Sequence, residues 1–394
     1  MRNDEPGVLL TGATGFLGGE VLARLLERSQ RPVYVLVRAG SEAEAQARLD
    51  GVIETLLGEP RSPHGAVAVA GDVTSFSLGM SAARRAWLAE RVDRIIHCAA
   101  SVSFTLGLAE SRAINVEGTR RLLELGEECA RRGGLECFVQ VSTAYVAGTQ
   151  EGRFTEADLD VGQGFRNPYE RTKFEAELLL RKRGSSLPVQ VVRPSIVVGD
   201  SRSGWTPAFN VLYAPLRAFS GGAYPVIPAR RSSPVDVVPV DYVADGILAL
   251  AGRPGTTYHL TASERASSVG ELIELASGYA GRPAPRVLSP RIYRHLIHPT
   301  LLRRGSERQR RALRRSEVFF PYFEMGMRYD NALAREALGP CGIEVPRLDS
   351  YFDRLMDFAV AAEWGRRPQS RRSARERAKL GRRRAAARPI LGLG

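Results

Sequence analysis

The 394-residue chain lacks the features that mark membrane-spanning, secreted and metal-binding proteins. No stretch approaches about 18 uninterrupted apolar residues, and no basic N-terminal region leads into an apolar signal core. The four cysteines form no C-x-x-C pair, and the five histidines form no H-E-x-x-H motif. We therefore expect a soluble, cytoplasmic protein with neither a disulfide framework nor a metal site.

Positive charge is concentrated in two segments instead of being spread over the chain. The formal net charge is +13, of which residues 365–394 carry +10 and residues 301–315 carry +6, so the remainder is slightly acidic at −3. Neither segment interleaves aromatic residues with its arginines, as stacking on nucleic acid bases would require. We therefore expect no nucleic-acid partner.

A glycine-rich motif, VLLTGATGFLGG at residues 8–19, joins an apolar strand signal to a stretch of helical periodicity. The G-x-x-G-x-x-G spacing is a variant of the dinucleotide fingerprint, in which glycine lets the backbone approach a pyrophosphate at a helix start. The alternative is a strand–helix turn that binds nothing. The candidate cofactor residues in this motif are Thr11, Gly12, Thr14, Gly15, Phe16, Leu17 and Gly18.

Short strand signals alternate with helical stretches through the first 260 residues. This alternation predicts an α/β fold, a doubly wound parallel Rossmann sheet, in which ligands bind at the carboxyl ends of the strands. Further candidate cofactor residues at such ends are Arg38, Asp72, Val73, Ala99, Ala100, Ser101, Pro194 and Ser195.

Two charged residues at strand ends bear on the choice of cofactor. Arg38 follows the strand signal at 33–37, where an acidic residue would bind the ribose 2′-hydroxyl and an arginine accommodates a 2′-phosphate. Arg38 therefore predicts NADPH in preference to NADH, the alternative being an ordinary exposed arginine. Asp72 either hydrogen-bonds the adenine amino group or forms an Asx turn.

Beyond residue 150 the pattern of strands and helices loosens, and long loops are expected at 148–168 and 199–235. We expect a dinucleotide-binding domain over 1–260 that includes both loops. A smaller substrate-binding region over 261–364, discontinuous because it is completed by 199–235, would close over the strand ends. The basic tail at 365–394 is almost free of large apolar residues and is expected to be disordered.

Shorter sequence patterns predict local features of individual helices. Ser41 and Glu44 predict a capping box, and a single helix is expected to carry both Asn115 and Leu125. Residues 291–315 mix apolar side chains with arginines, although Pro299 should interrupt any single helix. Such segments favour peripheral contact with an anionic membrane surface, the alternative being a solvated charged helix and a floppy tail.

A Tyr-x-x-x-Lys pair, Tyr169 and Lys173, opens a predicted helix, and its spacing places both side chains on one face. A neighbouring ammonium group stabilises a phenolate, so Tyr169 is expected to act as a general acid or base near neutral pH. Thr143 follows the strand signal at 137–141 and completes a candidate catalytic set at the carboxyl edge of the sheet.

The order of these motifs resembles the extended short-chain dehydrogenase/reductase superfamily. The segments IIHCAASVSF, FVQVSTAYVAG, NPYERTKFEAE and PVDVVPVDYVAD resemble its fatty acyl-CoA reductase and thioester reductase branch, the male-sterility-type group, over residues 8–250. The resemblance implies that Thr143 bonds the substrate carbonyl, that Tyr169 donates a proton and that Lys173 holds the nicotinamide ribose. It also implies that Asn115 positions a water or a backbone bend in a proton relay.

The resemblance further implies NADPH-dependent reduction of an acyl thioester, on coenzyme A or a carrier protein, to an aldehyde or alcohol. No adenylation or carrier module is recognisable, so the thioester is expected to arrive ready-made. A sugar-nucleotide or sterol-type member of the superfamily would share the same motifs. A dinucleotide-sensing module without catalysis is a third reading, against which the intact Thr, Tyr and Lys set argues. Acyl chain, carrier and oligomeric state are left open.

Overall fold

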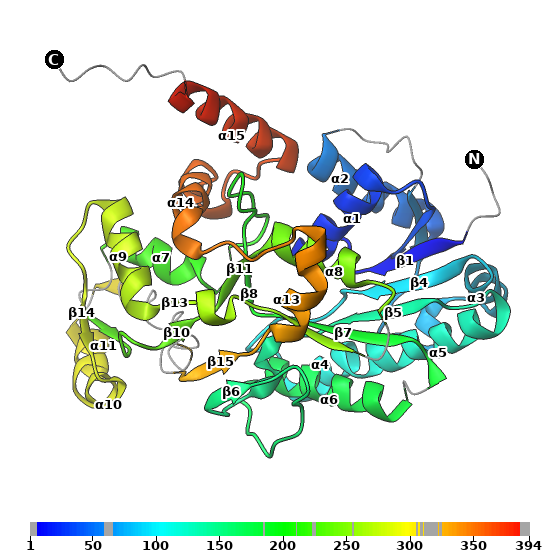
Figure 1. Cartoon of the computed structure of the whole chain (residues 1–394), viewed down its shortest axis with the longest axis horizontal. Helices are drawn as coiled ribbons and strands as arrows, with labels where there is room; N and C mark the ends of the chain where they lie inside the picture. The colour runs from blue at the N-terminus through cyan, green and yellow to red at the C-terminus, as the bar shows by residue number, and fades with distance from the viewer. Residues whose placement is uncertain are drawn as a thin grey trace.

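A seven-stranded parallel sheet with helices on both faces forms the centre of the molecule (Figure 1). The strand order is β12-β7-β5-β4-β1-β2-β3, and each neighbouring pair is parallel, so the predicted doubly wound sheet is confirmed. The computed structural model describes residues 6–58, 66–183, 186–209, 211–222, 226–253, 256–304, 306–307, 310, 322 and 325–386.

The strands of this sheet are short, and most of their residues are buried. They are β1 (Gly7–Thr11), β2 (Val33–Val37), β3 (Ala66–Ala70), β4 (Val92–His97), β5 (Cys137–Val141), β7 (Val189–Pro194) and β12 (Thr257–Leu260). Every residue of β1, β2 and β5 is buried, as expected for parallel strands that are covered on both faces.

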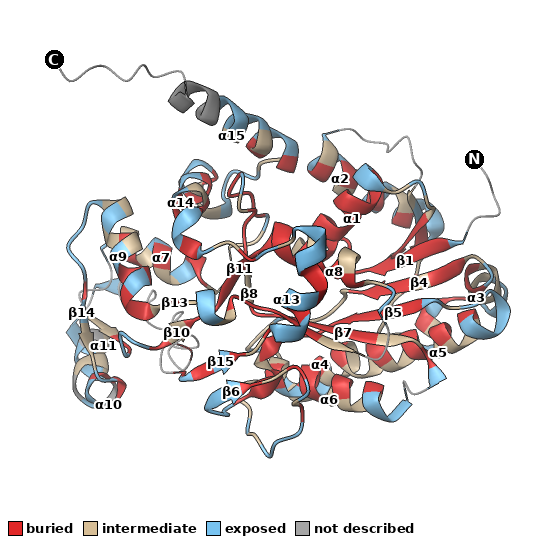
Figure 2. Ribbon diagram, in the orientation of Figure 1, coloured by how far each residue is buried: buried red, intermediate tan, exposed pale blue. Residues whose placement is uncertain are grey.

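Side chains that alternate along β1 enter two separate hydrophobic cores. Val8 and Leu10 pack with α1 (Phe16–Arg28), α2 (Glu42–Leu57) and α8 (Val240–Leu250). Leu9 packs on the opposite face with α3 (Ala82–Ala89), α5 (Glu117–Arg132) and α6 (Pro168–Arg183). The red interior in Figure 2 follows these two layers.

Another, smaller hydrophobic core, separate from the two that flank the sheet, lies beside the carboxyl end of the sheet. It is built by α7 (Tyr213–Ser220), α9 (Val269–Ala280) and α14 (Phe352–Ala361). The two-stranded sheets β8 (Ile196–Val198) with β11 (Val237–Pro239), β10 (Pro234–Val235) with β13 (Ser267–Ser268), and β9 (Val226–Pro228) with β14 (Arg286–Leu288) accompany it. Most of these elements come from the two segments, 199–235 and the C-terminal part, that the sequence predicts to form the substrate-binding region, whose role stays a prediction.

The expected boundary near residue 260 is not sharp in the structure. Helix α13 (Ala332–Leu338) packs with α8 in the core of the main sheet. Strand β15 (Met327–Tyr329) pairs in parallel with β6 (Gly152–Phe154). Segments from the C-terminal region therefore complete the dinucleotide-binding domain as well as the smaller region.

The described part of the basic tail, up to residue 386, differs most from its expectation, while residues 387–394 lie outside the described residues. Where disorder was expected, residues Arg371–Ala386 form helix α15, in which Arg371 and Ala374 are buried. Arginine can be buried here because Glu20 and Glu27 compensate its charge. Composition alone could not reveal acidic partners from the other end of the chain.

Two local expectations are also corrected. The predicted single helix is two helices, α4 (Leu108–Asn115) and α5, which meet at Val116. Ser41 does cap α2 by accepting a hydrogen bond from the Glu44 amide, but the Glu44 carboxylate accepts from Gly40, so the capping box is only half formed.

The segment that precedes the first arginine cluster is helical in all its described residues. It runs from α10 (Pro290–Ile292) through a π-helical turn (Tyr293–Ile297) into α11 (His298–Arg304). The helical path therefore continues through Pro299, and the irregularity is a π-helical turn just before it. Residues 305, 308–309 and 311–315 lie outside the described residues. None of the helices described is long and apolar enough to cross a membrane. The expected membrane contact and the cytoplasmic location stay predictions.

Candidate active site

The glycine motif forms a tight turn between β1 and α1 in which side chains have no room. Gly12 has a φ of +76°, and a Cβ on it would lie 2.6 Å from the Ala99 amide nitrogen. A Cβ on Gly18 would lie 2.2 Å from the Gly12 carbonyl oxygen. The residues present therefore fit a dinucleotide pyrophosphate, which needs close backbone approach at the first turn of a helix.

The expected cofactor residues lie along the carboxyl ends of β1 to β4. Thr14 and Gly15 are exposed at the start of α1, followed by the half-buried Phe16 and Leu17. The Thr11 hydroxyl accepts a hydrogen bond from the Ala99 amide at 3.2 Å, which joins the ends of β1 and β4.

The residues after β2 and β3 take the positions that the sequence predicts. Arg38 is exposed directly beyond β2. Asp72 forms the Asx turn that was one of its two readings, because its Oδ1 accepts from both the amide and the hydroxyl of Thr74 at 2.8 Å. Val73 accepts a hydrogen bond from Arg121 through its backbone carbonyl. Recognition of adenine by Asp72 stays untested.

Asn115 ties the loop after β4 to the helix that carries the Tyr-Lys pair. Its Oδ1 accepts from the Ser101 amide at 2.8 Å, and its Nδ2 donates to the Ser101 carbonyl at 3.1 Å and to the Thr172 hydroxyl at 2.9 Å. Asn115 is the last residue of α4, directly before Val116, where α4 meets α5. The proton-relay role of Asn115 stays a prediction.

Thr143, Tyr169 and Lys173 are brought together where β5 meets α6. Thr143 is buried, caps the 3₁₀ turn Ala144–Ala147 by accepting from the Tyr145 amide at 3.2 Å, and lies close enough to Tyr169 for its hydroxyl to lower the pKa of the phenol. Lys173 Nζ is buried and donates to the Val141 carbonyl at 2.7 Å. Two hydroxyl groups and an ammonium group therefore face one small region at the edge of the sheet.

Burial dominates the ionisation of this set. It raises the pKa of Tyr169 to about 12, with the Thr143 hydrogen bond opposing the rise. It lowers the pKa of Lys173 to about 8, against the nearby Glu177 carboxylate, which favours the ammonium form. The expected stabilisation of the Tyr169 phenolate by Lys173 stays a prediction. The phenol is held protonated, as a proton donor must be.

A buried ion pair that the sequence analysis missed lies next to the candidate catalytic set. Arg193 donates to both oxygens of Glu177, the shortest contact being 2.7 Å, and both side chains are at most 2% exposed. Glu177 also accepts from the Ser142 hydroxyl, next to Thr143. The usable signal was the position of Glu177 one helical turn after Lys173, on the same face of α6.

A small pocket lined mainly by apolar and aromatic side chains lies beside this set, next to Tyr145. Its lining includes Ile196, Leu212, Pro215, Met325 and Met327, together with the phenols Tyr145, Tyr322 and Tyr329 and the carboxylate of Asp236. The Phe104 ring lies 6.0 Å from that of Tyr169 and 5.5 Å from that of Tyr322, so aromatic contacts connect the pocket to Tyr169.

Ser195 and Pro194 lie at the end of β7, near these groups. Both are buried, and the Pro194 carbonyl accepts a hydrogen bond from Thr143 at 3.4 Å. Asp236 in the pocket accepts from the amides of Ala262 and Ser263, so backbone groups already satisfy its charge. The acidic residue therefore supports the loop, and the free lining of the pocket is largely apolar.

Comparisons with known proteins agree with this geometry. A family model described as male sterility protein matches residues 10–247. Fatty acyl-CoA reductase 1 of Xenopus laevis is 30% identical over 285 residues, which are 63% of this chain and 55% of that protein. The terminal R domain from the myxalamid PKS-NRPS biosynthetic pathway has a TM-score of 0.78 at 26% identity and covers 94% of both chains. A thiolation-reductase di-domain from an archaeal non-ribosomal peptide synthetase has a TM-score of 0.73 at 22% identity, covering 92% of this chain and 78% of that one.

The parallel sheet, the glycine cradle and the Thr-Tyr-Lys set define an extended short-chain dehydrogenase/reductase with a dinucleotide site. Within that class, the chain belongs to the male sterility protein family. The resemblance seen in the sequence is therefore confirmed. The chain spans about half the length of the fatty acyl-CoA reductase that it matches.

The glycine cradle yields a direct test. We expect Gly18→Ala to raise the dissociation constant of NAD(P)H by about tenfold or more, equivalent to about 1.4 kcal/mol, because the new Cβ would displace the Gly12 carbonyl. Gly51→Ala is the matched control, since nothing lies within 4 Å of that helical position. It should leave cofactor binding unchanged and stabilise the fold by roughly 0.5–1 kcal/mol. Fluorescence titration and urea unfolding measure both, and equal affinities for the two variants would contradict the cradle.

Proposed function

We propose that the protein is an NADPH-dependent reductase of an acyl thioester, carried on coenzyme A or on a carrier protein, and that it yields an aldehyde or alcohol. One observation carries the proposal: the Thr143 and Tyr169 donors converge beside an apolar pocket. The relatives support it, since one is named a fatty acyl-CoA reductase and another couples a reductase to a thiolation domain.

The cofactor would lie along the carboxyl edge of the sheet. The backbone from Gly12 to Leu17 would hold the pyrophosphate, and Arg38 at the end of β2 would pair with the 2′-phosphate. Lys173 donates one proton to Val141, which leaves two for the hydroxyl groups of the nicotinamide ribose. NADPH bound in this way supplies the hydride.

Thr143 and Tyr169 act on the carbonyl oxygen of the thioester. This oxygen gains negative charge as the hydride arrives, and preorganised donors in a buried site stabilise that charge. Tyr169 has a pKa of about 12, so its phenol carries a proton at neutral pH and can transfer it to the oxygen. Collapse of the resulting hemithioacetal expels the thiol and leaves an aldehyde. Once the spent cofactor is exchanged for a second NADPH and Tyr169 has regained a proton from solvent, the same two donors can polarise the aldehyde for a second reduction.

The pocket indicates an apolar acyl group. Methionine, isoleucine, leucine and proline side chains line it, and methionine adapts to ligands of different shape. Tyr145 and Tyr322 meet edge to face with their ring centroids 5.3 Å apart and form an aromatic wall beside the pocket. A nucleotide sugar, the alternative substrate, would bring polar and charged groups that this lining does not match.

A cofactor-oxidation assay across acyl-CoA, acyl-carrier, nucleotide-sugar and sterol substrates tests the proposal. We expect NADPH oxidation with apolar acyl thioesters, and aldehyde or alcohol detected by mass spectrometry. Oxidation with a nucleotide-sugar or sterol ketone, and none with any thioester, would reject the thioester reductase in favour of the alternative. Omitting the acyl substrate controls for uncoupled oxidation.

Removing the Tyr169 hydroxyl should slow the reaction without weakening cofactor binding. We expect Tyr169→Phe to lower kcat by roughly 10²- to 10⁴-fold with little change in NADPH affinity, because only the proton donor is lost. Tyr279→Phe serves as a remote control and should retain full activity, because the Tyr279 hydroxyl in α9 donates to Asp357 of α14, away from the candidate site.

The pH dependence adds a second readout on the wild type. The Lys173 ammonium loses its proton as the pH rises through about 8, so kcat/KM should fall above that pH.

For the Tyr169→Phe variant, a kcat within threefold of the wild-type value would exclude the phenol as proton donor.

Cofactor preference depends on Arg38. We expect Arg38→Ala to weaken NADPH binding by about 1.5–3 kcal/mol, the value of a charge-assisted hydrogen bond, and to leave NADH binding nearly unchanged. Calorimetric titration with each cofactor measures the difference. Equal losses for NADPH and NADH would show that Arg38 does not contact the 2′-phosphate.

A further inference from the structure

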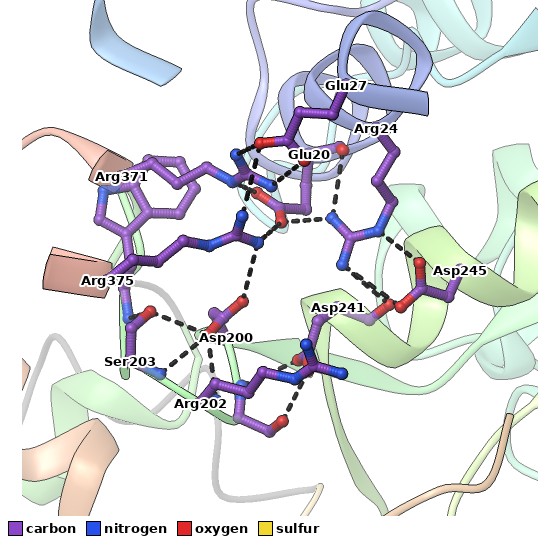
Figure 3. A network of polar contacts seen from close by, with 12 residues as sticks. Glu20, Arg24, Glu27, Asp200, Arg202, Ser203, Asp241, Asp245, Arg371 and Arg375 are labelled. Carbon is purple, nitrogen blue, oxygen red and sulfur yellow. Dashed lines mark hydrogen bonds and ion pairs between the residues drawn. The ribbon is translucent and has the colours of Figure 1, made fainter. Parts of the chain in front are cut away.

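A cluster of buried charges lies behind the dinucleotide helix α1 and joins it to the C-terminal helix α15 (Figure 3). Its centre is Glu20, which is fully buried in α1 directly after the glycine motif. Three guanidinium groups surround its carboxylate. Arg24 comes from the same helix, while Arg371, at 2.8 Å, and Arg375, at 3.2 Å, come from α15. Glu20 is therefore charge-compensated largely by residues near the end of the chain.

The cluster extends from Glu20 to three other parts of the domain. Arg371 also pairs with Glu27, the penultimate residue of α1, at 2.6 Å. Arg24 reaches Asp245 of α8 at 2.6 Å, and Arg375 reaches Asp200 in the loop after β8 at 3.5 Å. Docked α15 thus holds α1 against the 200–205 loop.

A second and separate contact leads from the C-terminal segment to the glycine motif itself. The Trp205 side chain is buried, and its indole nitrogen donates to the Gln369 carbonyl at 3.0 Å. The same ring meets Phe16 edge-on with a centroid distance of 6.3 Å. Phe16 is the first residue of α1, so the chain entering α15 supports the turn where the pyrophosphate would bind.

The loop that carries Trp205 has little freedom to adjust. Gly204 has a φ of +73°, and a Cβ there would lie 1.9 Å from the Arg354 carbonyl oxygen in α14. Asp200 accepts hydrogen bonds from the amide and the hydroxyl of Ser203, both at 2.8 Å. A displacement of α15 would therefore be transmitted to α1 and not absorbed in this loop.

Burial makes the arrangement strongly dependent on the docked helix. A buried carboxylate is unfavourable unless it is paired, so undocking of α15 leaves Glu20 with Arg24 alone. The stable response is a shift of α1 that brings Glu20 towards water. The same shift would move the first turn of α1, which has to remain in place for a bound pyrophosphate.

We propose that Arg371 is a positioning residue of the dinucleotide site, and that docking of α15 and binding of the dinucleotide stabilise each other. Arg371 acts through α1, since it pairs with Glu20 at 2.8 Å and with Glu27 at 2.6 Å. The proposal rests on the proposed use of NADPH at this site. By linkage, the effect of α15 on cofactor affinity equals the effect of the cofactor on α15 docking.

The test compares three full-length proteins: the wild type, Arg371→Met and Lys379→Met. Lys379 is exposed on α15, so its variant removes the same charge without touching the cluster. We expect Arg371→Met to raise the NADPH dissociation constant about tenfold and Lys379→Met to leave it unchanged. Hydrogen exchange supplies the reciprocal readout, and saturating NADPH should slow exchange of amides 371–380 in the wild type but not in Arg371→Met.

A milder variant covers the case in which Arg371→Met fails to fold. Trp205→Phe keeps the ring beside Phe16 but removes the bond to Gln369, and it should raise the NADPH dissociation constant about threefold. The proposal is overturned if the wild type binds NADPH, the variants bind it equally well, and the hydrogen-exchange rates of amides 371–380 in the wild type are the same with and without NADPH. That result leaves the reductase function standing. A wild type that binds no NADPH would overturn both proposals.

Discussion

The close approach of α1 to the end of β1 is the constraint on which the rest of the site depends. Side chains at positions 12 and 18 would overlap the Ala99 amide and the Gly12 carbonyl, so only glycine lets the helix start here. Because the strands are parallel, their carboxyl ends lie at one edge of the sheet, and the glycine turn after β1 therefore lies at the same edge as Thr143 and Tyr169. The same helix carries Glu20, through which the C-terminal helix is held.

Burial determines the ionisation of the candidate catalytic groups. Thr143 and Lys173 are almost fully covered, and the phenol of Tyr169 is shielded well enough that its pKa rises to about 12. In such surroundings a hydroxyl that faces a developing oxyanion is worth more than it is in water. The Glu177–Arg193 pair behind them supplies a negative charge that favours the ammonium form of Lys173.

Much of the fold and the catalytic set could be predicted, because both depend on local patterns. The glycine spacing, the apolar strand runs and the Tyr169-Lys173 pair each lie within a few residues, and the structure places them together. The helix at 371–386 and the Glu177–Arg193 brace could not be predicted in this way. They depend on ion pairs between distant segments, and charge composition alone does not show which arginine meets which carboxylate. The break at Val116 escaped detection because its backbone is still close to helical.

The most direct test of the central claim is the fate of the hydride. The protein would be incubated with an acyl thioester and NADPH carrying deuterium on the transferred position of the nicotinamide, and the products would be analysed by mass spectrometry. The account predicts one deuterium on the former thioester carbon of the aldehyde, and two on that carbon where reduction proceeds to the alcohol. Product without deuterium, or deuterium found only in a sugar or sterol supplied as competitor, would contradict it.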